Sequence, residues 1–207
     1  MDNNKKGILF VVSAPSGAGK TSLCKEITKS VSHLQHSISY TTRSPRIGEI
    51  DGKDYFFVDK ERFTRMVKED NFLEWAEVHG NLYGTDRDHI MGMINNGVDT
   101  ILDIDSQGAM QIKKKYKEGI FIYILPPSFD ALRTRLLKRK SESDKEIEKR
   151  LKRAKLEIMN YKEYYYFIVN DDFNKALREL EAIIITERLK ARKKDISSWI
   201  QDNFMKE

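Results

Sequence analysis

Near its start the chain carries the stretch Ser13-Ala14-Pro15-Ser16-Gly17-Ala18-Gly19-Lys20-Thr21-Ser22. An apolar run over residues 8–12 precedes this stretch, and residues 23–27 have the pattern of a helix. A buried strand, a glycine-rich turn and a helix start are the context that a phosphate-binding loop requires. Gly17 and Gly19 have no Cβ, so the backbone can curl until several N–H groups point at one anion. The stretch therefore predicts a nucleotide site.

Individual side chains of this loop have predicted roles. We expect Lys20 to reach the β- and γ-phosphates of a nucleotide, and the Thr21 hydroxyl to sit on Mg²⁺. Ala14 departs from the strict pattern, which opens with glycine, and left-handed backbone angles at this position would strain an alanine. The alternative is an ordinary strand–helix turn, but the full run through Gly-Lys-Thr argues against it.

Length and composition restrict the class of protein. A chain of 207 residues suits one domain with elaborations, and its 40% hydrophobic residues can build a core. No apolar run approaches the roughly 20 residues of a membrane span, and the first residues lack the apolar stretch of a signal peptide. The single cysteine, Cys24, excludes an internal disulfide, and we expect it to be a packing residue. These features predict a soluble cytoplasmic protein.

The net charge is +5, and basic residues cluster at 113–115, 133–155 and 188–194. Nucleic-acid binding, solvated helix faces and anionic small substrates would each account for such clusters. Acidic residues are interspersed throughout the clusters, which does not favour nucleic acid as the primary partner.

Four apolar stretches separated by helical patterns predict an α/β fold, with a parallel sheet that helices cover on both faces. The stretches are residues 8–12, 98–105, 119–125 and 166–170. In such sheets, ligands bind at the carboxyl ends of the strands, where Gly17, Asp103 and Asp105 all fall. We expect the acid at the end of the second stretch to lie near Mg²⁺.

Turn residues and periodicity predict the remaining elements. Residues 44–54 read as a loop, 55–58 as a short strand, and Asp59 as the N-cap of a helix over residues 60–69. Residues 80–85 read as turn-rich, and a helix follows to about residue 95. The predicted helices after the third strand span 128–160, with a break at 140–144, then 173–188, and a separate helix in the tail from residue 190.

Residues 41–58, with the sequence TTRSPRIGEIDGKDYFFV, closely resemble the signature of guanylate kinases. The loop, Tyr83-Gly84-Thr85, residues 102–108 (LDIDSQG) and residues 168–172 (IVNDD) continue the match in the family's order, over about residues 7–188. Ala14 also occurs in bacterial members. The resemblance implies a P-loop NTPase-type fold, with a parallel sheet flanked by helices, and the Mg²⁺-dependent reaction of ATP with GMP to give ADP and GDP.

The resemblance also implies a division of the chain. A core of residues 7–36, 89–128 and 156–188 would carry the ATP site. An inserted GMP-binding subdomain would span residues 37–88, and a helical lid residues 129–155. Residues 189–207 would form a C-terminal helical tail outside the family's domain.

Site residues follow from the same resemblance. The residues that would bind ATP are Ala14, Pro15, Ser16, Gly17, Ala18, Gly19, Lys20, Thr21, Ser22 and Asn170. Arg43, Arg46, Tyr55 and Tyr83 would hold the GMP phosphate, and Ser39, Glu74, Thr85 and Asp105 would bind guanine. Lys20, Arg43 and the lid residues Arg135, Arg139 and Arg150 would be catalytic, while Thr21 and Asp103, the latter through water, would hold Mg²⁺.

The chemistry of these residues agrees with the resemblance. Guanine presents N–H donors at N1 and N2, which a carboxylate such as Glu74 can accept, whereas adenine has no donor at N1. Arg43 and Arg46 suit a dianionic phosphate because each guanidinium forms forked hydrogen bonds. The family often has Ser where Thr85 stands, and Gly-Arg-Gly where Lys138-Arg139-Lys140 stands, which puts the flexibility of the lid in question. We expect Arg133 and Arg153 to be solvated neighbours.

The two alternative functions are a protein-binding module without catalysis and a kinase for another nucleotide. Guanylate-kinase-like modules that bind proteins have lost catalysis and typically lack a working phosphate loop, whereas this chain has Lys20, Thr21 and Asp103. A kinase for another nucleotide would not need Glu74 or the signature over residues 41–55. The sequence carries no mark of its oligomeric state, so a homo-oligomer stays open.

Overall fold

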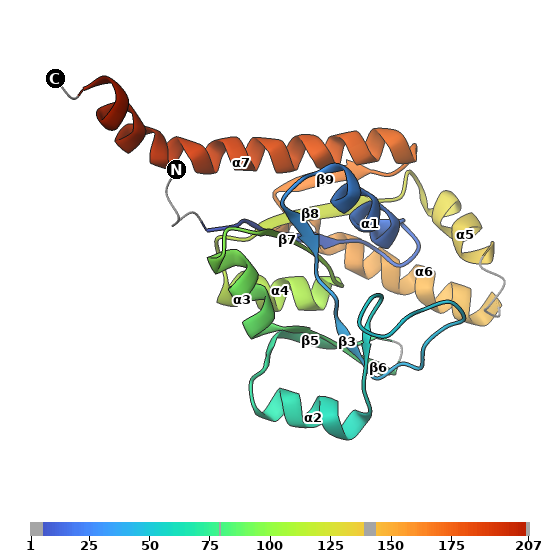
Figure 1. Cartoon of the computed structure of the whole chain (residues 1–207). Coiled ribbons are helices and arrows are strands. Elements are labelled where there is room, and N and C mark those ends of the chain that lie inside the picture. Colours follow the sequence, from blue (N-terminus) through green and yellow to red (C-terminus); the bar gives the residue numbers. More distant parts are fainter. Residues whose placement is uncertain (1–5, 79, 139–143, 206–207) are drawn as a thin grey trace.

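The computed structural model describes residues 6–78, 80–138 and 144–205. Its centre is a parallel five-stranded sheet in the order β2-β7-β1-β8-β9 (Figure 1). These strands are β2 (Leu34–His36), β7 (Asp99–Asp103), β1 (Leu9–Ser13), β8 (Ile120–Leu125) and β9 (Tyr166–Val169). The predicted α/β fold is confirmed, but the sequence pattern missed β2, because three residues are too few for a clear apolar run.

Helices cover both faces of this sheet because every strand at its centre is apolar on both sides. Phe10 and Val12 of β1 point to one face, where they pack with α1 (Lys20–Ser30) and α7 (Phe173–Phe204). Leu9 and Val11 point to the other face, which α3 (Arg87–Asn95) and α4 (Ser106–Lys115) cover. Cys24 is fully buried in the first of these clusters, which confirms that it is a packing residue.

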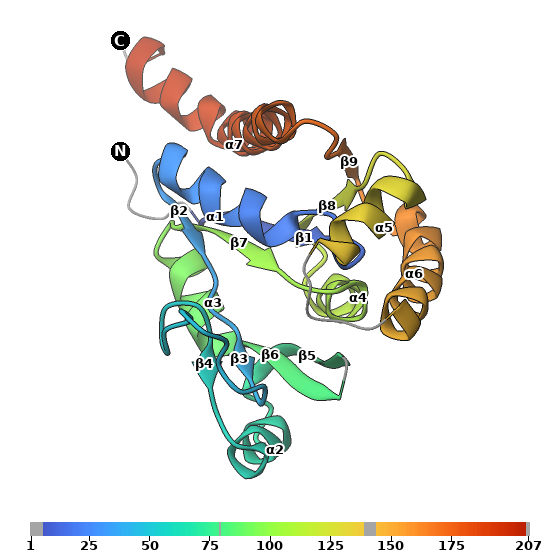
Figure 2. The same ribbon diagram turned by 90° about the vertical axis from the view of Figure 1, so that its right-hand side faces the viewer.

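A second, four-stranded sheet in the order β4-β3-β6-β5 lies beside the central sheet (Figure 2). It consists of β3 (Tyr40–Thr41), β4 (Phe56–Phe57), β5 (Phe72–Val78) and β6 (Asn81–Asp86), with α2 (Lys60–Lys68) packed on it. Asp59 caps α2 as predicted, since its carboxylate accepts from the Arg62 N–H at 2.6 Å.

The turn-rich reading of residues 80–85 is wrong after Gly80, because residues 81–85 form most of strand β6. Gly84 lies inside that strand, paired with Trp75 of β5. A Cβ on Gly84 would lie 2.9 Å from the ring of Phe72, so this glycine permits a close approach rather than a turn.

Helix α4 joins the two sheets. It begins directly after Asp105. The side-chain amide of Gln111 on α4 pairs with the backbone of Trp75 on β5. The Gln111 Nε2 donates to the Trp75 carbonyl at 2.6 Å, and the Gln111 Oε1 accepts from the Trp75 N–H at 3.2 Å. Gln111 therefore satisfies backbone groups that an additional strand would otherwise pair.

Two helices follow β8 and lie at one side of the molecule. They are α5 (Phe129–Leu137) and α6 (Asp144–Ile158), and the 3-10 helix η1 (Met159–Glu163) leads from α6 toward β9. Leu132 and Leu136 of α5 pack against Ile147 and Ala154 of α6, so the pair has its own small core. Arg139 and Lys140 lie outside the described residues, as does most of the predicted break at 140–144.

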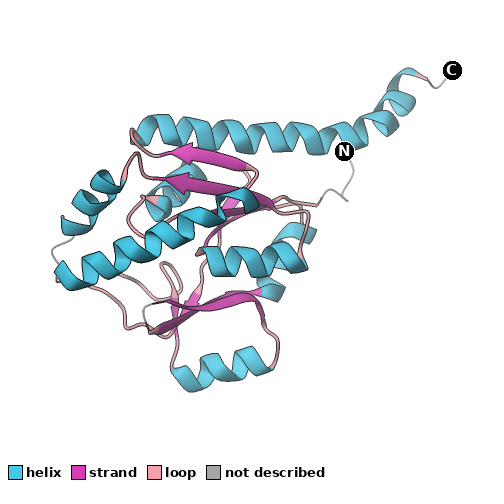
Figure 3. Cartoon of the chain, turned by 180° about the vertical axis from the view of Figure 1, so that it is seen from behind, coloured by secondary structure: helices cyan, strands magenta, loops and turns pink. Residues whose placement is uncertain are grey.

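The tail is not a separate helix. Helix α7 runs without interruption from Phe173 to Phe204 and extends past the edge of the central sheet (Figure 3). No glycine or proline occurs within these residues, so nothing in the sequence ends the helix near residue 189. Among the described helices, none combines the length and apolar character needed to cross a membrane.

Asp99 anchors both ends of the domain to the sheet. Its Oδ1 accepts from the Ile8 N–H at 2.7 Å, and its Oδ2 accepts from the Arg188 Nε at 2.6 Å. The Arg188 Nη2 also donates to the carbonyl of Ser32 at 2.7 Å. Asp99 is only 7% exposed, so these hydrogen bonds are poorly replaced by water.

We predict that Asp99→Ala lowers the free energy of unfolding by about 2–4 kcal/mol, because Ile8 N–H and the Arg188 guanidinium lose their shared acceptor. Urea titration followed by circular dichroism measures this change. The matched control is Glu26→Ala, which breaks the exposed Lys29–Glu26 pair and is expected to cost at most about 0.5 kcal/mol. Equal losses in the two variants would contradict the anchoring role of Asp99.

Candidate active site

The loop between β1 and α1 has the backbone conformation of an anion cradle. Gly17 and Gly19 adopt φ angles of +98° and +94°, which only glycine adopts without strain. Ala14 does not have a positive φ; among the described non-glycine residues only His33 and Asp70 do. Alanine therefore fits the first position of the motif without the strain that the sequence pattern suggested.

Lys20 and Asp103 form an ion pair at the foot of the loop. The Lys20 Nζ also donates to the carbonyl of Ile104 at 2.6 Å. Burial alone would lower the pKa of the Lys20 ammonium, but the Asp103 carboxylate outweighs burial and holds this pKa above its usual value. Burial would likewise raise the pKa of Asp103, yet Lys20 and the Thr21 hydroxyl hold it below its usual value. Both groups are therefore charged at neutral pH.

Thr21 and Asp103 offer a donor set that fits Mg²⁺. The Thr21 hydroxyl helps to lower the pKa of the Asp103 carboxyl, and both residues line the same cleft. Mg²⁺ prefers hard oxygen ligands and usually takes only one or two from the protein, with water and phosphate oxygens supplying the rest. No group of three or more His, Cys, Asp or Glu side chains that could hold a metal ion occurs among the described residues. A Mg²⁺ site of the kind described above does not need such a group.

A buried carboxylate lies in the opposite wall of the cleft. Glu74 of β5 is 3% exposed, and its Oε1 accepts from the hydroxyl of Thr85 on β6 at 2.6 Å. Burial, assisted by the nearby Asp105 carboxylate, raises the pKa of Glu74 to about 7, against the opposing effect of the Thr85 hydrogen bond. The backbone of α4 touches this carboxylate, because a Cβ on Gly108 would lie 2.2 Å from the Glu74 Oε2.

Asp105 is the N-cap of α4. Its Oδ1 accepts from the Gly108 N–H at 2.9 Å, and its Oδ2 accepts from the Gln107 Nε2 at 3.2 Å. The cap orients this carboxylate toward the cleft beside Glu74. Two carboxylate acceptors from different elements therefore meet on one wall.

Arginine and tyrosine side chains gather near the loop that follows β3. The Arg43 Nη2 donates to both carboxylate oxygens of Glu49 at 2.9 Å, and its guanidinium lies 5.3 Å from the centre of the Tyr55 ring. The rings of Tyr55 and Tyr83 meet edge to face at 6.0 Å. Arg46 is exposed and lines the cleft, whereas Arg43 does not line it.

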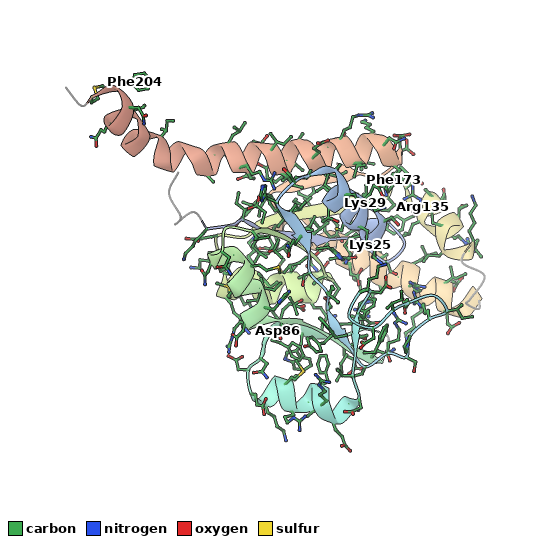
Figure 4. The ribbon with its side chains drawn as sticks, in the orientation of Figure 1. Lys25, Lys29, Asp86, Arg135, Phe173 and Phe204 are labelled. Carbon is green, nitrogen blue, oxygen red and sulfur yellow. The ribbon has the colours of Figure 1, made fainter. Side chains whose placement is uncertain are left out.

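Helices α5 and α6 reach the loop from the other side. Arg150 of α6 donates to the Ser16 hydroxyl. Arg135, which lies on α5 (Figure 4), donates through Nη2 to the carbonyl of Asn170 at 2.7 Å. The Asn170 Nδ2 donates to the carbonyl of Ala18 at 2.7 Å. Asn170 thus holds the back of the loop; its assignment to ATP binding stays a prediction.

Most of the predicted site residues line one cleft of about 270 Å³. They are Ala14, Pro15, Ser16, Gly17, Ala18, Gly19, Lys20, Thr21, Ser22, Ser39, Arg46, Tyr55, Glu74, Tyr83, Asp103, Asp105 and Arg150. Thr85 lies behind Glu74, while Arg43, Arg135 and Asn170 support the cleft from outside. A second cavity of about 550 Å³ adjoins the cleft and shares Thr21, Ser22, Ser39, Arg46, Tyr55 and Asp103 with it. Arg139 lies outside the described residues.

The sequence pattern missed two charged residues of the cleft. Arg153 and Glu157 of α6 line it, and the Arg153 Nε donates to the Glu157 Oε1 at 2.8 Å. The expectation that Arg153 is only a solvated neighbour is therefore wrong. Its position three residues after Arg150 was the available signal, because residues at that spacing share a helix face.

Comparisons with known proteins agree with this geometry. The family model described as guanylate kinase matches residues 6–187. A guanylate kinase of Geobacter metallireducens is 51% identical over 184 residues, which cover 89% of this chain and 91% of the relative. A guanylate kinase of Caldanaerobacter subterraneus is 47% identical over 203 residues, 98% of each chain.

Solved structures give the same result for the fold. The crystal structure of guanylate kinase from Anaplasma phagocytophilum has a TM-score of 0.82 and 32% identity, covering 99% of this chain and 98% of the other. A shikimate kinase from Bacteroides thetaiotaomicron has a TM-score of 0.52 at 14% identity, covering 86% of this chain and 98% of the other, which is a likeness of fold alone.

We predict that Glu74→Gln stabilises the protein at high pH. Because the pKa of Glu74 is about 7 in the folded state and 4.5 for a freely exposed glutamate, the folded state binds more protons between these values. Stability therefore falls as the pH rises through this window, and the neutral glutamine does not suffer this loss. Between pH 5 and pH 8 the difference in unfolding free energy between variant and parent should grow by about 2–3 kcal/mol.

Urea titrations of both proteins at pH 5 and pH 8 measure this difference. Glu77→Gln, on the exposed side of the same strand, is the control and should show no such growth. If the difference in unfolding free energy between Glu74→Gln and the parent is the same at both pH values, Glu74 is ionised in the folded protein from pH 5 to pH 8.

Proposed function

Because this chain belongs to the guanylate kinase family, and is an enzyme that phosphorylates GMP with ATP, we propose how its residues divide this work. The core is residues 7–36, 89–128 and 156–188, and it binds ATP at the loop. Residues 37–88 hold GMP, residues 129–155 form the lid, and residues 189–207 are a tail outside the catalytic unit. The relatives compared are bacterial, and we place the reaction in the cytoplasm, where both substrates occur.

The observation that carries the base specificity is the buried pair of Glu74 and Thr85 beside Asp105. Thr85 occupies one side of the Glu74 Oε1, which leaves the other lone pairs of this carboxylate for the N1 and N2 donors of guanine. Ser39 and Asp105 complete the guanine site. Adenine would leave the carboxylate partly unpaired in a dry wall, a loss that disfavours AMP strongly.

The phosphate of GMP lies, in this proposal, between Arg46, Tyr55 and Tyr83, with Arg43 behind them. Guanidinium groups match the dianion geometrically, and the Arg43–Glu49 pair orients one of them in advance. A phosphate oxygen is already an anion, so the reaction needs no general base. Catalysis then depends on holding the two phosphates in line and on neutralising their charge.

The loop N–H groups and Lys20 hold the ATP phosphates, and Arg135, Arg139 and Arg150 bring positive charge from the lid. Thr21 and Asp103, the latter through water, would hold Mg²⁺, which would supply charge neutralisation at the phosphate oxygens. Arg150 already contacts Ser16 of the loop, so α6 is placed to exclude water from the transferring group.

We predict that Lys20→Met lowers kcat about 1,000-fold or more, because the transferring phosphoryl group loses its main protein cation. GMP affinity, measured by titration calorimetry, should change less than about threefold, since Lys20 lies on the ATP side. Lys29→Met on the exposed face of the same helix is the control and should retain full activity. Normal turnover in Lys20→Met would refute the assignment of the loop.

We predict that Glu74→Gln raises KM for GMP about 30- to 100-fold and leaves KM for ATP nearly unchanged, because a charged acceptor for two guanine donors is lost. The assay is ADP release from ATP·Mg²⁺ with GMP, AMP, UMP or dTMP as acceptor. The parent should use GMP alone. An unchanged preference for GMP over AMP in the variant would show that another group reads the base.

The pH dependence of GMP affinity gives an independent check of the role of Glu74. GMP requires the carboxylate form of a group whose pKa is about 7, so GMP affinity should increase from pH 6 to pH 8. The GMP phosphate itself titrates near pH 6 in both proteins. The pH dependence that disappears in Glu74→Gln therefore belongs to Glu74.

A further inference from the structure

Helix α6 carries two arginines on the face that lines the cleft. Arg150 contacts Ser16 in the phosphate-binding loop, and Arg153 follows three residues later. Figure 2 shows α6 beside α4, the helix that begins after Asp105. One helix of the lid therefore faces both the loop and the wall assigned to guanine.

Arg153 lies between two carboxylates of that wall. Its Nε donates to the Glu157 Oε1 at 2.8 Å, and its Nη2 lies 3.7 Å from the Asp105 Oδ2. The Arg153 side chain is 34% exposed, whereas those of Glu157 and Asp105 are 19% and 21% exposed. Burial on this scale leaves the ion pairs partly screened, so each is modest in energy.

The position of Asp105 depends on few groups. Gly108 N–H and the Gln107 amide hold its carboxylate from its own helix. Among the described residues, Arg153 is the one side chain from another element that pairs with this carboxylate. Arg153 is therefore the described side chain through which another element acts on Asp105.

The local balance of charge also favours a cation at this point. Glu74, Asp105 and Glu157 are three acids around one wall, and the Asp105 carboxylate raises the pKa of the other two beyond the effect of burial. Arg153 opposes this effect at Glu157, where its hydrogen bond and its charge lower the pKa. Without a cation, the carboxylates of Asp105 and Glu157 would repel one another.

We propose that Arg153 is a positioning residue for GMP, which acts through Asp105 and joins the lid helix to the guanine side of the site. Arg150 and Arg153 together then let a single helix contact the ATP loop and the GMP wall. The inference rests on the proposed assignment of Asp105 to guanine. It predicts that removing the Arg153 charge changes KM for GMP more than KM for ATP.

The test is steady-state kinetics of full-length Arg153→Met, which keeps the stem of the side chain but removes its charge. KM for GMP should rise about three- to fivefold, the range expected for a partly exposed ion pair. KM for ATP and kcat should stay within about twofold. Arg153→Lys should restore much of the GMP affinity, and Lys152→Met, an exposed neighbour on α6, should match the parent.

A double-mutant cycle with Asp105→Asn tests the route of the effect. If Arg153 acts through Asp105, then Arg153→Met should raise KM for GMP no further when Asp105→Asn is already present. A purely structural role of Arg153 would lower the melting temperature and raise both KM values in either background.

The results distinguish a wrong assignment of Asp105 from a wrong role of Arg153. An unchanged KM for GMP in Asp105→Asn would overturn the assignment of Asp105 to guanine, and with it this inference. A raised KM in Asp105→Asn, with parental values in Arg153→Met or with additive effects in the double variant, would overturn the role of Arg153 alone.

Discussion

The active site depends on one ion pair that is largely removed from water. Lys20 opens α1 and Asp103 closes β7, a strand that pairs in parallel with β1. Buried charges are stable only when they are paired and hydrogen-bonded, so the ammonium needs Asp103 and the Ile104 carbonyl in fixed positions. The loop between β1 and α1 must then follow a single path, which the positive φ angles of Gly17 and Gly19 permit. Arg135 and Asn170 fix the same loop from behind, through the Ala18 carbonyl.

The guanine wall depends on the core in a different way. Glu74 belongs to the small sheet, but its carboxylate rests against the start of α4, where Gly108 leaves room for it. Asp105 caps the same helix, so a helix of the core sets the distance between the two acids that we propose bind guanine. The close packing also explains why Glu74 resists ionisation: the site holds its acceptor in a dry place, at a cost in stability above neutral pH.

Local sequence patterns predict much of this organisation. Apolar runs predict four of the five central strands, and the glycine spacing with Lys20 predicts the loop. The cap at Asp59 follows from residue type alone. Gly84 misleads, because a glycine that admits the ring of Phe72 looks like a glycine that makes a turn. Arg153 misleads too, since its pairing with Asp105 joins residues 48 positions apart, a contact that helix periodicity does not encode. The continuous α7 shows that a family boundary near residue 188 need not be a boundary of structure.

The contact of Gln111 with Trp75 affects how this protein behaves among its own copies. Strand β5 is at the edge of the small sheet, and the unpaired backbone of an edge strand readily accepts a strand from another molecule. Gln111 occupies both backbone groups of Trp75 with a side-chain amide of the same donor and acceptor pattern. A foreign strand would have to displace this amide before it could extend the sheet. The residue that attaches the small sheet to the core therefore also protects the protein against aggregation through that edge.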